Sequence, residues 1–181
     1  MLNIFAITTR GLEPITAQEM QQAGLVISAI AYRRVQATCP ILAPIPGLRT
    51  ADDVFIKLAD WQPVTHLRAE LDQFISRSAE LSLEPALTAI RTLREIPHQP
   101  SFSVTANFVG KRNYTAPEIK KSMQTGIIQS QPAWLYVEDD HDADINLRVF
   151  IEHDTALVGI RITRHPLHRR PYKTDHLPGS L

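Results

Sequence analysis

The sequence of 181 residues contains one cysteine, Cys39. A lone cysteine excludes an internal disulfide framework and a cysteine-rich zinc site, and it suits a reducing compartment. No run approaches the roughly 20 apolar residues that a membrane-spanning helix needs. The start of the chain, MLNIFAITTRGLEP, lacks the cationic segment and long apolar core of a secretory signal. We therefore expect a cytoplasmic protein without a membrane partner.

The sequence also lacks an excess of charge of either sign. Nineteen Lys and Arg balance nineteen Asp and Glu, so the formal net charge is zero and any argument from charge must rest on local clusters. The composition, 44% hydrophobic and 21% charged, is typical of a folded chain with one ordinary domain or two small ones. A glycine-rich strand-to-helix turn for a dinucleotide or S-adenosylmethionine is missing as well.

The first part of the chain predicts a small sheet with one covered face. The pattern indicates a strand at 3–9, a short helix that ends at Gly24, and one long or two short strands over 25–39. Three prolines then interrupt regular structure before a strand at 53–61. This order favours a ferredoxin-like domain.

The second part predicts a different order of elements. Helical stripes cover 65–81, with Thr65 as the expected N-cap, and 85–97. A strand at 101–110 precedes a helix that begins near Thr115, and two alternating strands then form a hairpin. The fold class is therefore α+β, an α/β sandwich, with the order α-α-β-α-β-β after the first domain.

A basic loop lies directly before the helix at Thr115. Lys111 and Arg112 stand where the positive end of the helix dipole disfavours cations, unless an anion binds there. A phosphate at the helix start would receive backbone N–H groups and both cations, and Asn113 and Tyr114 could add hydrogen bonds or a stacking surface. The alternative is a solvated loop before a helix that caps itself through Thr115 and a glutamate three residues later.

A second basic run follows the hairpin. Between residues 155 and 174 the sequence has no carboxylate, and its cations include Arg161, Arg164, Arg169 and Arg170. Lys120, on the outward face of the helix from Thr115, would extend the same track. Two basic clusters in one α/β unit favour a nucleic-acid backbone over a small metabolite. The alternative is a charged linker that binds nothing.

Two patterns that resemble metal sites are incomplete. The acidic run at 140–144 has the first three spacings of a calcium loop, but Ile145 replaces the turn glycine and Ile151 the bidentate glutamate. His165 and His168 are separated by a proline that prevents a helix from aligning them. We therefore predict an acidic surface turn, no metal site, no cofactor bound by this chain and no catalytic residue.

Four segments resemble the THUMP-containing RNA guanine-N2 methyltransferases. The start of that family's N-terminal domain is similar to FAITTRGLEPITAQEM, and the strand, basic loop and helix of its THUMP domain are similar to FSVTANFVGKRNYTAPEIKKSMQTGI. The hairpin that follows resembles INLRVFIEHDTALVGIRIT, and the segment that joins THUMP to the methyltransferase domain resembles LHRRPYKTDHLPGSL. The resemblance covers nearly the full chain.

The resemblance implies a ferredoxin-like domain at 1–62, a THUMP domain at 63–166 and a linker at 167–181. The S-adenosylmethionine domain that would methylate a guanine N2 would be missing, so we expect a fragment of a larger enzyme or a short gene. The family docks structured RNA, usually tRNA. The residues expected to contact it are Lys111, Arg112, Asn113, Tyr114, Thr115, Lys120, Arg161, Arg164, Arg169 and Arg170.

Two other functions fit the same pattern. The 4-thiouridine synthetases also combine a ferredoxin-like domain with THUMP, although the final segment favours the methyltransferases. A pure protein-interaction domain, without RNA binding, is the second alternative. The target nucleotide, the choice between tRNA and ribosomal RNA, and the oligomeric state do not follow from the sequence.

Overall fold

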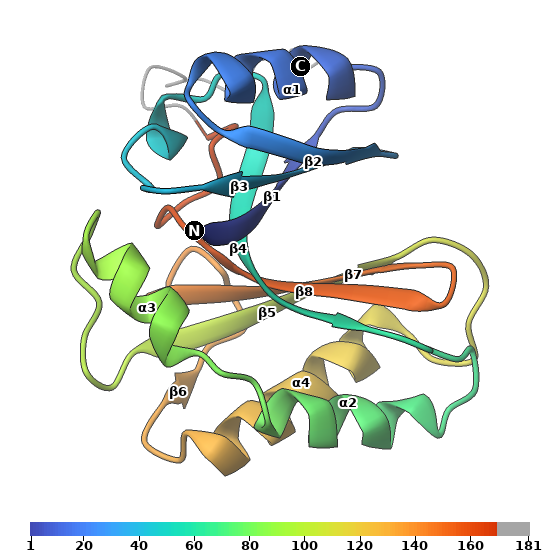
Figure 1. The fold of residues 1–181 in the computed structure, drawn as a ribbon. Coiled ribbons are helices and arrows are strands. Elements are labelled where there is room, and N and C mark those ends of the chain that lie inside the picture. The colour runs from blue at the N-terminus through green and yellow to red at the C-terminus, as the bar shows by residue number, and fades with distance from the viewer. Residues whose placement is uncertain (170–181) are drawn as a thin grey trace, which may run out of the picture.

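One mixed sheet of eight strands runs through residues 1–169, the part of the chain that the computed structural model describes (Figure 1). Within these residues no helix has the length and apolar character needed to cross a membrane. The first group of elements is β1 (Leu2–Thr8), α1 (Glu13–Gln22), β2 (Val26–Ala31), β3 (Arg34–Cys39) and β4 (Ala51–Trp61). The second group is α2 (Glu70–Ala79), α3 (Glu84–Arg91), β5 (Ser101–Phe108), α4 (Ala116–Ser130), β6 (Leu135–Tyr136), β7 (Ile145–Glu152) and β8 (Thr155–Arg161).

The strand order is β2-β3-β1-β4-β8-β7-β5-β6, which confirms the α+β sandwich. Strand β5 runs parallel to β6 and β7, and the other pairs are antiparallel. The 11-residue strand β4 pairs with β1 through its first half and with β8 through its second half. The proposed boundary at 62/63 therefore falls directly after a strand that belongs to both parts of the sheet.

Several boundaries differ from the sequence pattern. Residues 25–39 form the hairpin β2–β3, and Arg33 at its turn has φ 54. Helix α2 begins at Glu70 rather than Thr65. Thr65 lies in the preceding loop, where its backbone N–H (2.8 Å) and hydroxyl (3.0 Å) donate to the Glu70 carboxylate. Helix α3 ends at Arg91, and the two-residue strand β6 is an addition to the predicted order.

The helices cover one face of the sheet. Ile4, Ile56 and Ile160 are cross-strand partners, so their side chains share this face, and they belong to one core cluster with residues of α1, α2, α3 and α4. Figure 1 shows α1 over β1–β3 at the top and α2 with α4 along β5, β7 and β8 at the bottom. Within the described residues the opposite face carries no helix, and we call it the helix-free face.

The sheet curves strongly toward its helix-free face. Arg34 on β3 lies 3.6 Å from the Glu152 carboxylate on β7 and 5.7 Å from the centre of the Phe150 ring, although β1, β4 and β8 separate these strands in the sheet. Phe5 and Phe55 stack inside the curve, with ring centres 5.1 Å apart, and both are fully buried. The curved sheet therefore provides a concave surface with an aromatic floor.

Candidate nucleic-acid interface

The start of α4 already holds an anion from the chain itself. The Glu118 carboxylate accepts hydrogen bonds from the Thr115 backbone N–H (2.8 Å) and hydroxyl (2.9 Å), and the Thr115 hydroxyl accepts one from the Glu118 N–H (3.4 Å). The Thr115 N–H and the Arg68 guanidinium lower the pKa of Glu118. This capping box confirms the self-capped helix, and Glu118 occupies the place where we expected a phosphate.

Arg112 joins three loops. Its guanidinium donates hydrogen bonds to the carbonyl of Thr65 (3.1 Å), to the hydroxyl of Tyr114 (3.1 Å) and to the carbonyl of His153. These acceptors belong to the β4–α2 loop, the β5–α4 loop and the β7–β8 turn. Because these acceptors hold the side chain in place, Arg112 serves as a structural link in this conformation.

The other residues of the basic loop differ in accessibility. Tyr114 is 2% exposed, and its hydroxyl donates to the Thr65 carbonyl at 2.7 Å, so the expected stacking surface at Tyr114 is wrong. Asn113 is exposed, and its backbone N–H donates to the His66 carbonyl at 2.9 Å. Lys111 is exposed as well and has no ion-pair partner among residues 1–169.

Further along α4, Lys120 is half-buried and forms an ion pair with Glu138 at 2.9 Å. Lys120 therefore contacts a carboxylate of its own chain. An RNA phosphate would have to replace that partner.

Arg161 is a buried residue, contrary to the expectation of a cation available to RNA. It is 2% exposed, and its guanidinium binds Asp53 through Nε (2.7 Å) and Asp140 through Nη2 (3.0 Å). The alternation of β8 predicted a polar face for this residue, but the curvature of the sheet buries it. Arg164 and Arg169 beyond β8 are exposed. Arg170 lies outside the described residues.

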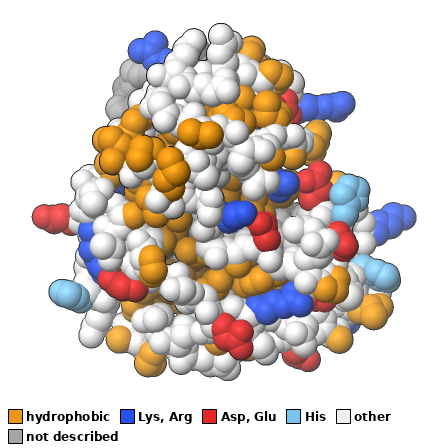
Figure 2. Space-filling model, in the orientation of Figure 1, with side chains coloured by type: hydrophobic (Ala, Val, Ile, Leu, Met, Phe, Trp, Pro, Cys, Tyr) orange, Lys and Arg blue, Asp and Glu red, His pale blue; other side chains and the backbone are white. Residues whose placement is uncertain are grey.

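The two predicted clusters lie at opposite ends of β8. Arg112 contacts His153 in the turn before this strand, whereas Arg161 is its last residue. Seven residues at about 3.3 Å each separate the ends by roughly 20 Å. Figure 2 shows positive side chains interspersed with acidic ones on the face in view. The clusters therefore do not form one continuous cationic surface around the start of α4.

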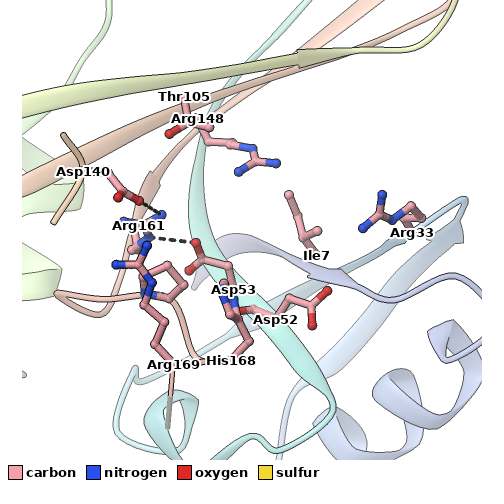
Figure 3. A pocket seen from close by; sticks show the side chains of 11 residues that line it. Ile7, Arg33, Asp52, Asp53, Thr105, Asp140, Arg148, Arg161, His168 and Arg169 are labelled. Atoms are coloured by element: carbon pink, nitrogen blue, oxygen red, sulfur yellow. Dashed lines mark hydrogen bonds and ion pairs between the residues drawn. The ribbon is translucent and has the colours of Figure 1, made fainter. Parts of the chain in front are cut away.

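A pocket of about 440 Å³ opens on the helix-free face at the Arg161 end of the sheet (Figure 3). Its charged lining comes from both parts of the chain and consists of Arg33, Arg148, Arg161, Arg169, Asp52, Asp53 and Asp140. Arg33 and Arg148 were not among the predicted site residues, although Arg148 lies on the polar face of an alternating strand. The acidic partners of Arg161 were not predicted either, since Asp53 is 108 residues away.

The acidic run and the histidines have structural partners. Asp140 binds Arg161, and the Asp144 carboxylate accepts hydrogen bonds from the Ser101 backbone N–H (2.9 Å) and hydroxyl (2.8 Å). His165 stacks on His141 with ring centres 4.8 Å apart, and burial lowers the pKa of His165. Among residues 1–169 no three His, Cys, Asp or Glu side chains gather as a metal site would require.

Comparisons with known proteins identify the fold. No protein-family model and no curated protein matches the sequence. A predicted N6-adenine-specific DNA methylase from Listeria monocytogenes has a similar structure, with a TM-score of 0.73 and 19% identity over 99% of this chain and 45% of that protein. TrmN from Thermus thermophilus matches with a TM-score of 0.66 and 20% identity over 94% of this chain and 48% of its own.

A 4-thiouridine synthetase, solved with RNA and bound ATP, is a more distant match. Its TM-score is 0.51 and its identity 13%, over 88% of this chain and 41% of the synthetase. The chain therefore spans about half the length, or less, of these three proteins. At these identities the similarity shows the fold, which the predicted DNA methylase, TrmN and the 4-thiouridine synthetase share.

Proposed function

We propose that this chain is an RNA-binding module, for tRNA in the first instance, of a cytoplasmic S-adenosylmethionine-dependent RNA guanine-N2 methyltransferase. The observation that carries the proposal is the similarity of 94% of the chain to about half of TrmN from Thermus thermophilus. The RNA in the complex of the 4-thiouridine synthetase supports the same class of partner. Methyl transfer and cofactor binding would belong to the remainder of the parent enzyme.

The exposed cations define the contacts that we propose. Lys111 shares a surface hollow with His153 at one end of β8, and Arg164 and Arg169 stand at the other end, roughly 20 Å away by strand length. An RNA backbone is long enough to reach both ends. Such contacts position the RNA without selecting its sequence, so the shape of the RNA would determine the target.

Four of the residues expected at the interface take a supporting role in this proposal. Arg112 and Tyr114 hold the loop that presents Lys111, and Thr115 caps the helix behind it. Arg161 anchors the end of β8, from which Arg164 and Arg169 extend. Asn113 and Lys120 stay candidates for direct contact, Lys120 only if Glu138 releases it.

The main alternative is the RNA-binding part of a 4-thiouridine synthetase-like enzyme. It is favoured by the RNA-bound synthetase of similar fold. The coding sequence beyond Leu181 distinguishes the two. A glycine-rich S-adenosylmethionine turn supports the methyltransferase, and a pyrophosphatase loop supports the synthetase.

Fluorescence anisotropy with bulk tRNA over a series of salt concentrations tests RNA binding by the 181-residue chain. We expect binding that weakens steeply with salt. The slope of log K against the logarithm of the salt concentration is negative, and its magnitude should decrease by about 0.7 to 0.9 for each phosphate contact removed. Lys111→Ala should remove one contact, and the double variant Arg164→Ala/Arg169→Ala should remove two.

Lys121→Ala is the matched control, because Lys121 is an exposed lysine of α4 outside the proposed contacts. It should leave the slope unchanged. Absence of tRNA binding at low salt would contradict the proposal and favour a protein-interaction domain. Equal slopes for the wild type and both contact variants would exclude Lys111, Arg164 and Arg169 from the interface.

A further inference from the structure

Arg148 is a half-buried cation without a carboxylate partner among residues 1–169. Its guanidinium lies 5.9 Å from the centre of the Phe55 ring, and its buried Nε atom has no hydrogen-bond partner within the described residues. The nearby carboxylates of Asp53 and Asp140 both bind Arg161. Buried charges in proteins are ordinarily paired. Arg148 has lost part of its contact with water, and no carboxylate of residues 1–169 binds it in return.

Burial disfavours the charged form of this side chain. Desolvation lowers the pKa of the Arg148 guanidinium, and the attraction of Asp53 opposes that change only in part. An anion that entered the pocket would attract the Arg148 guanidinium and so offset the free-energy cost of its desolvation. Ligand binding therefore requires less further dehydration of Arg148 than of a fully exposed arginine.

Other donors converge on the same space. Thr105 lines the pocket, and its hydroxyl oxygen accepts a hydrogen bond from Asn146 Nδ2 at 3.0 Å, which leaves the O–H group available to a ligand. Figure 3 shows the side chain of Arg33 facing Arg148 across Ile7, while Arg169 lies at the opposite rim. Four arginines outnumber three aspartates in the lining, so the pocket attracts anions.

The floor of the pocket strengthens this attraction. Phe5, Phe55 and Leu157 form a buried apolar cluster beneath the charged residues, and Arg148 and Arg161 both lie against the Phe55 ring. Water cannot screen the charges from that side, and a low-dielectric wall concentrates the field of the arginines. Guanidinium groups supply several donors to one anion, and phosphate accepts hydrogen bonds from more than one arginine at once.

We propose that the pocket on the helix-free face is a phosphate-binding site with the Arg148 guanidinium as its central ligand. Arg33 and Thr105 complete the donor set, and Arg169 adds positive charge at the opposite rim. The volume of about 440 Å³ exceeds that of one phosphate group and falls within the range of small-ligand sites. The phosphate can thus come from a free mononucleotide or from the end of an RNA chain. The site is independent of Lys111, and only Arg169 is shared with the proposed RNA contacts.

Thermal unfolding of the 181-residue chain in inorganic phosphate tests the site, with sodium chloride at equal ionic strength as the reference. At a phosphate concentration about ten times the dissociation constant, the midpoint temperature should rise by about 3–6 °C. Arg148→Met keeps an unbranched apolar side chain but removes the guanidinium, and it should abolish the rise. Lys121→Ala, outside the pocket, should retain it.

Thr105→Val and Arg33→Asn extend the test if Arg148→Met does not fold. Asparagine tolerates the positive φ of Arg33, and each variant should reduce the phosphate response. A response to phosphate no larger than the response to chloride would overturn the proposal. A response of equal size in the wild type and in the pocket variants would overturn it as well.

Two further ligands identify the source of the phosphate. A short RNA with a 5′-phosphate should bind more tightly than the same RNA with a 5′-hydroxyl if the site takes an RNA end, and Arg148→Met should remove the difference. A response to AMP with equal binding of the two RNAs would identify a free nucleotide site. Failure of both RNAs to bind would contradict the proposed RNA-binding function and leave the phosphate result intact.

Discussion

Replacement of Arg112 by alanine should destabilise the fold while a change at its neighbour Lys111 should not. Arg112 donates three hydrogen bonds to Thr65, Tyr114 and His153, and its guanidinium lies 5.9 Å from the centre of the Tyr114 ring. Each hydrogen bond contributes about 0.5–1.5 kcal/mol net, and a partly exposed cation–ring contact contributes about 0.5–1 kcal/mol. Because the site is partly exposed, we expect a total loss of about 2–4 kcal/mol.

Urea unfolding of the two variants measures this difference. Arg112→Ala should lower the midpoint with an unchanged slope, whereas Lys111→Ala should change the free energy of unfolding by less than about 0.5 kcal/mol, since Lys111 is exposed. Arg112→Lys keeps the charge but loses the fork of donors, so it should resemble the alanine variant.

Tyr114→Phe completes a double-mutant cycle with Arg112→Ala. The Tyr114 hydroxyl accepts from Arg112 and donates to Thr65, so the two changes should show a coupling energy of about 0.5–1.5 kcal/mol. If Arg112→Ala left stability unchanged and lowered only the affinity for RNA, Arg112 would be a direct RNA contact and our interpretation of its hydrogen bonds would be wrong.

Two further predictions concern α4. Gly126→Ala should destabilise the protein by about 1–3 kcal/mol in urea unfolding, because an added Cβ would lie 2.0 Å from Ser78 Oγ and 2.2 Å from the Ile75 carbonyl oxygen of α2. Gly47→Ala, where the added Cβ meets no atom of residues 1–169 within 4 Å, is the control and should be near neutral. The pKa of Glu118 is lowered from 4.5 in the folded state, so its stabilising contribution is present above that value and disappears as the pH falls through the lowered pKa. Urea unfolding between about pH 7 and pH 3 should show that Glu118→Gln loses this contribution to the pH dependence of the free energy of unfolding. The same pH dependence in the wild type and the variant would refute this prediction.

The sequence predicted the features that depend on neighbouring residues. The strands were predictable because apolar residues alternate with a period of two, as they do without interruption over 101–108. The capping box at Thr115 follows from a spacing of three residues. Even locally, however, the N-cap of α2 is Ala69 rather than Thr65, four residues later than predicted.

The features that the sequence did not predict depend on residues that are distant in the chain. Arg161 was expected at the surface, but the curved sheet buries it and brings Asp53 and Asp140 to its guanidinium. The role of Arg112 was hidden because two of its acceptors are backbone carbonyls, which no side-chain pattern reveals. The role proposed for Arg148 could not be predicted, since it depends on the missing partner of its buried Nε atom among residues 1–169.

Strand β4 has a consequence for any attempt to divide the protein. A fragment that began at Pro63 would lack β4, and β8 would then expose the row of backbone N–H and C=O groups that now pair with Phe55–Trp61. Unpaired strand edges recruit other chains. Such a fragment should therefore self-associate or aggregate, and the two halves should be produced together.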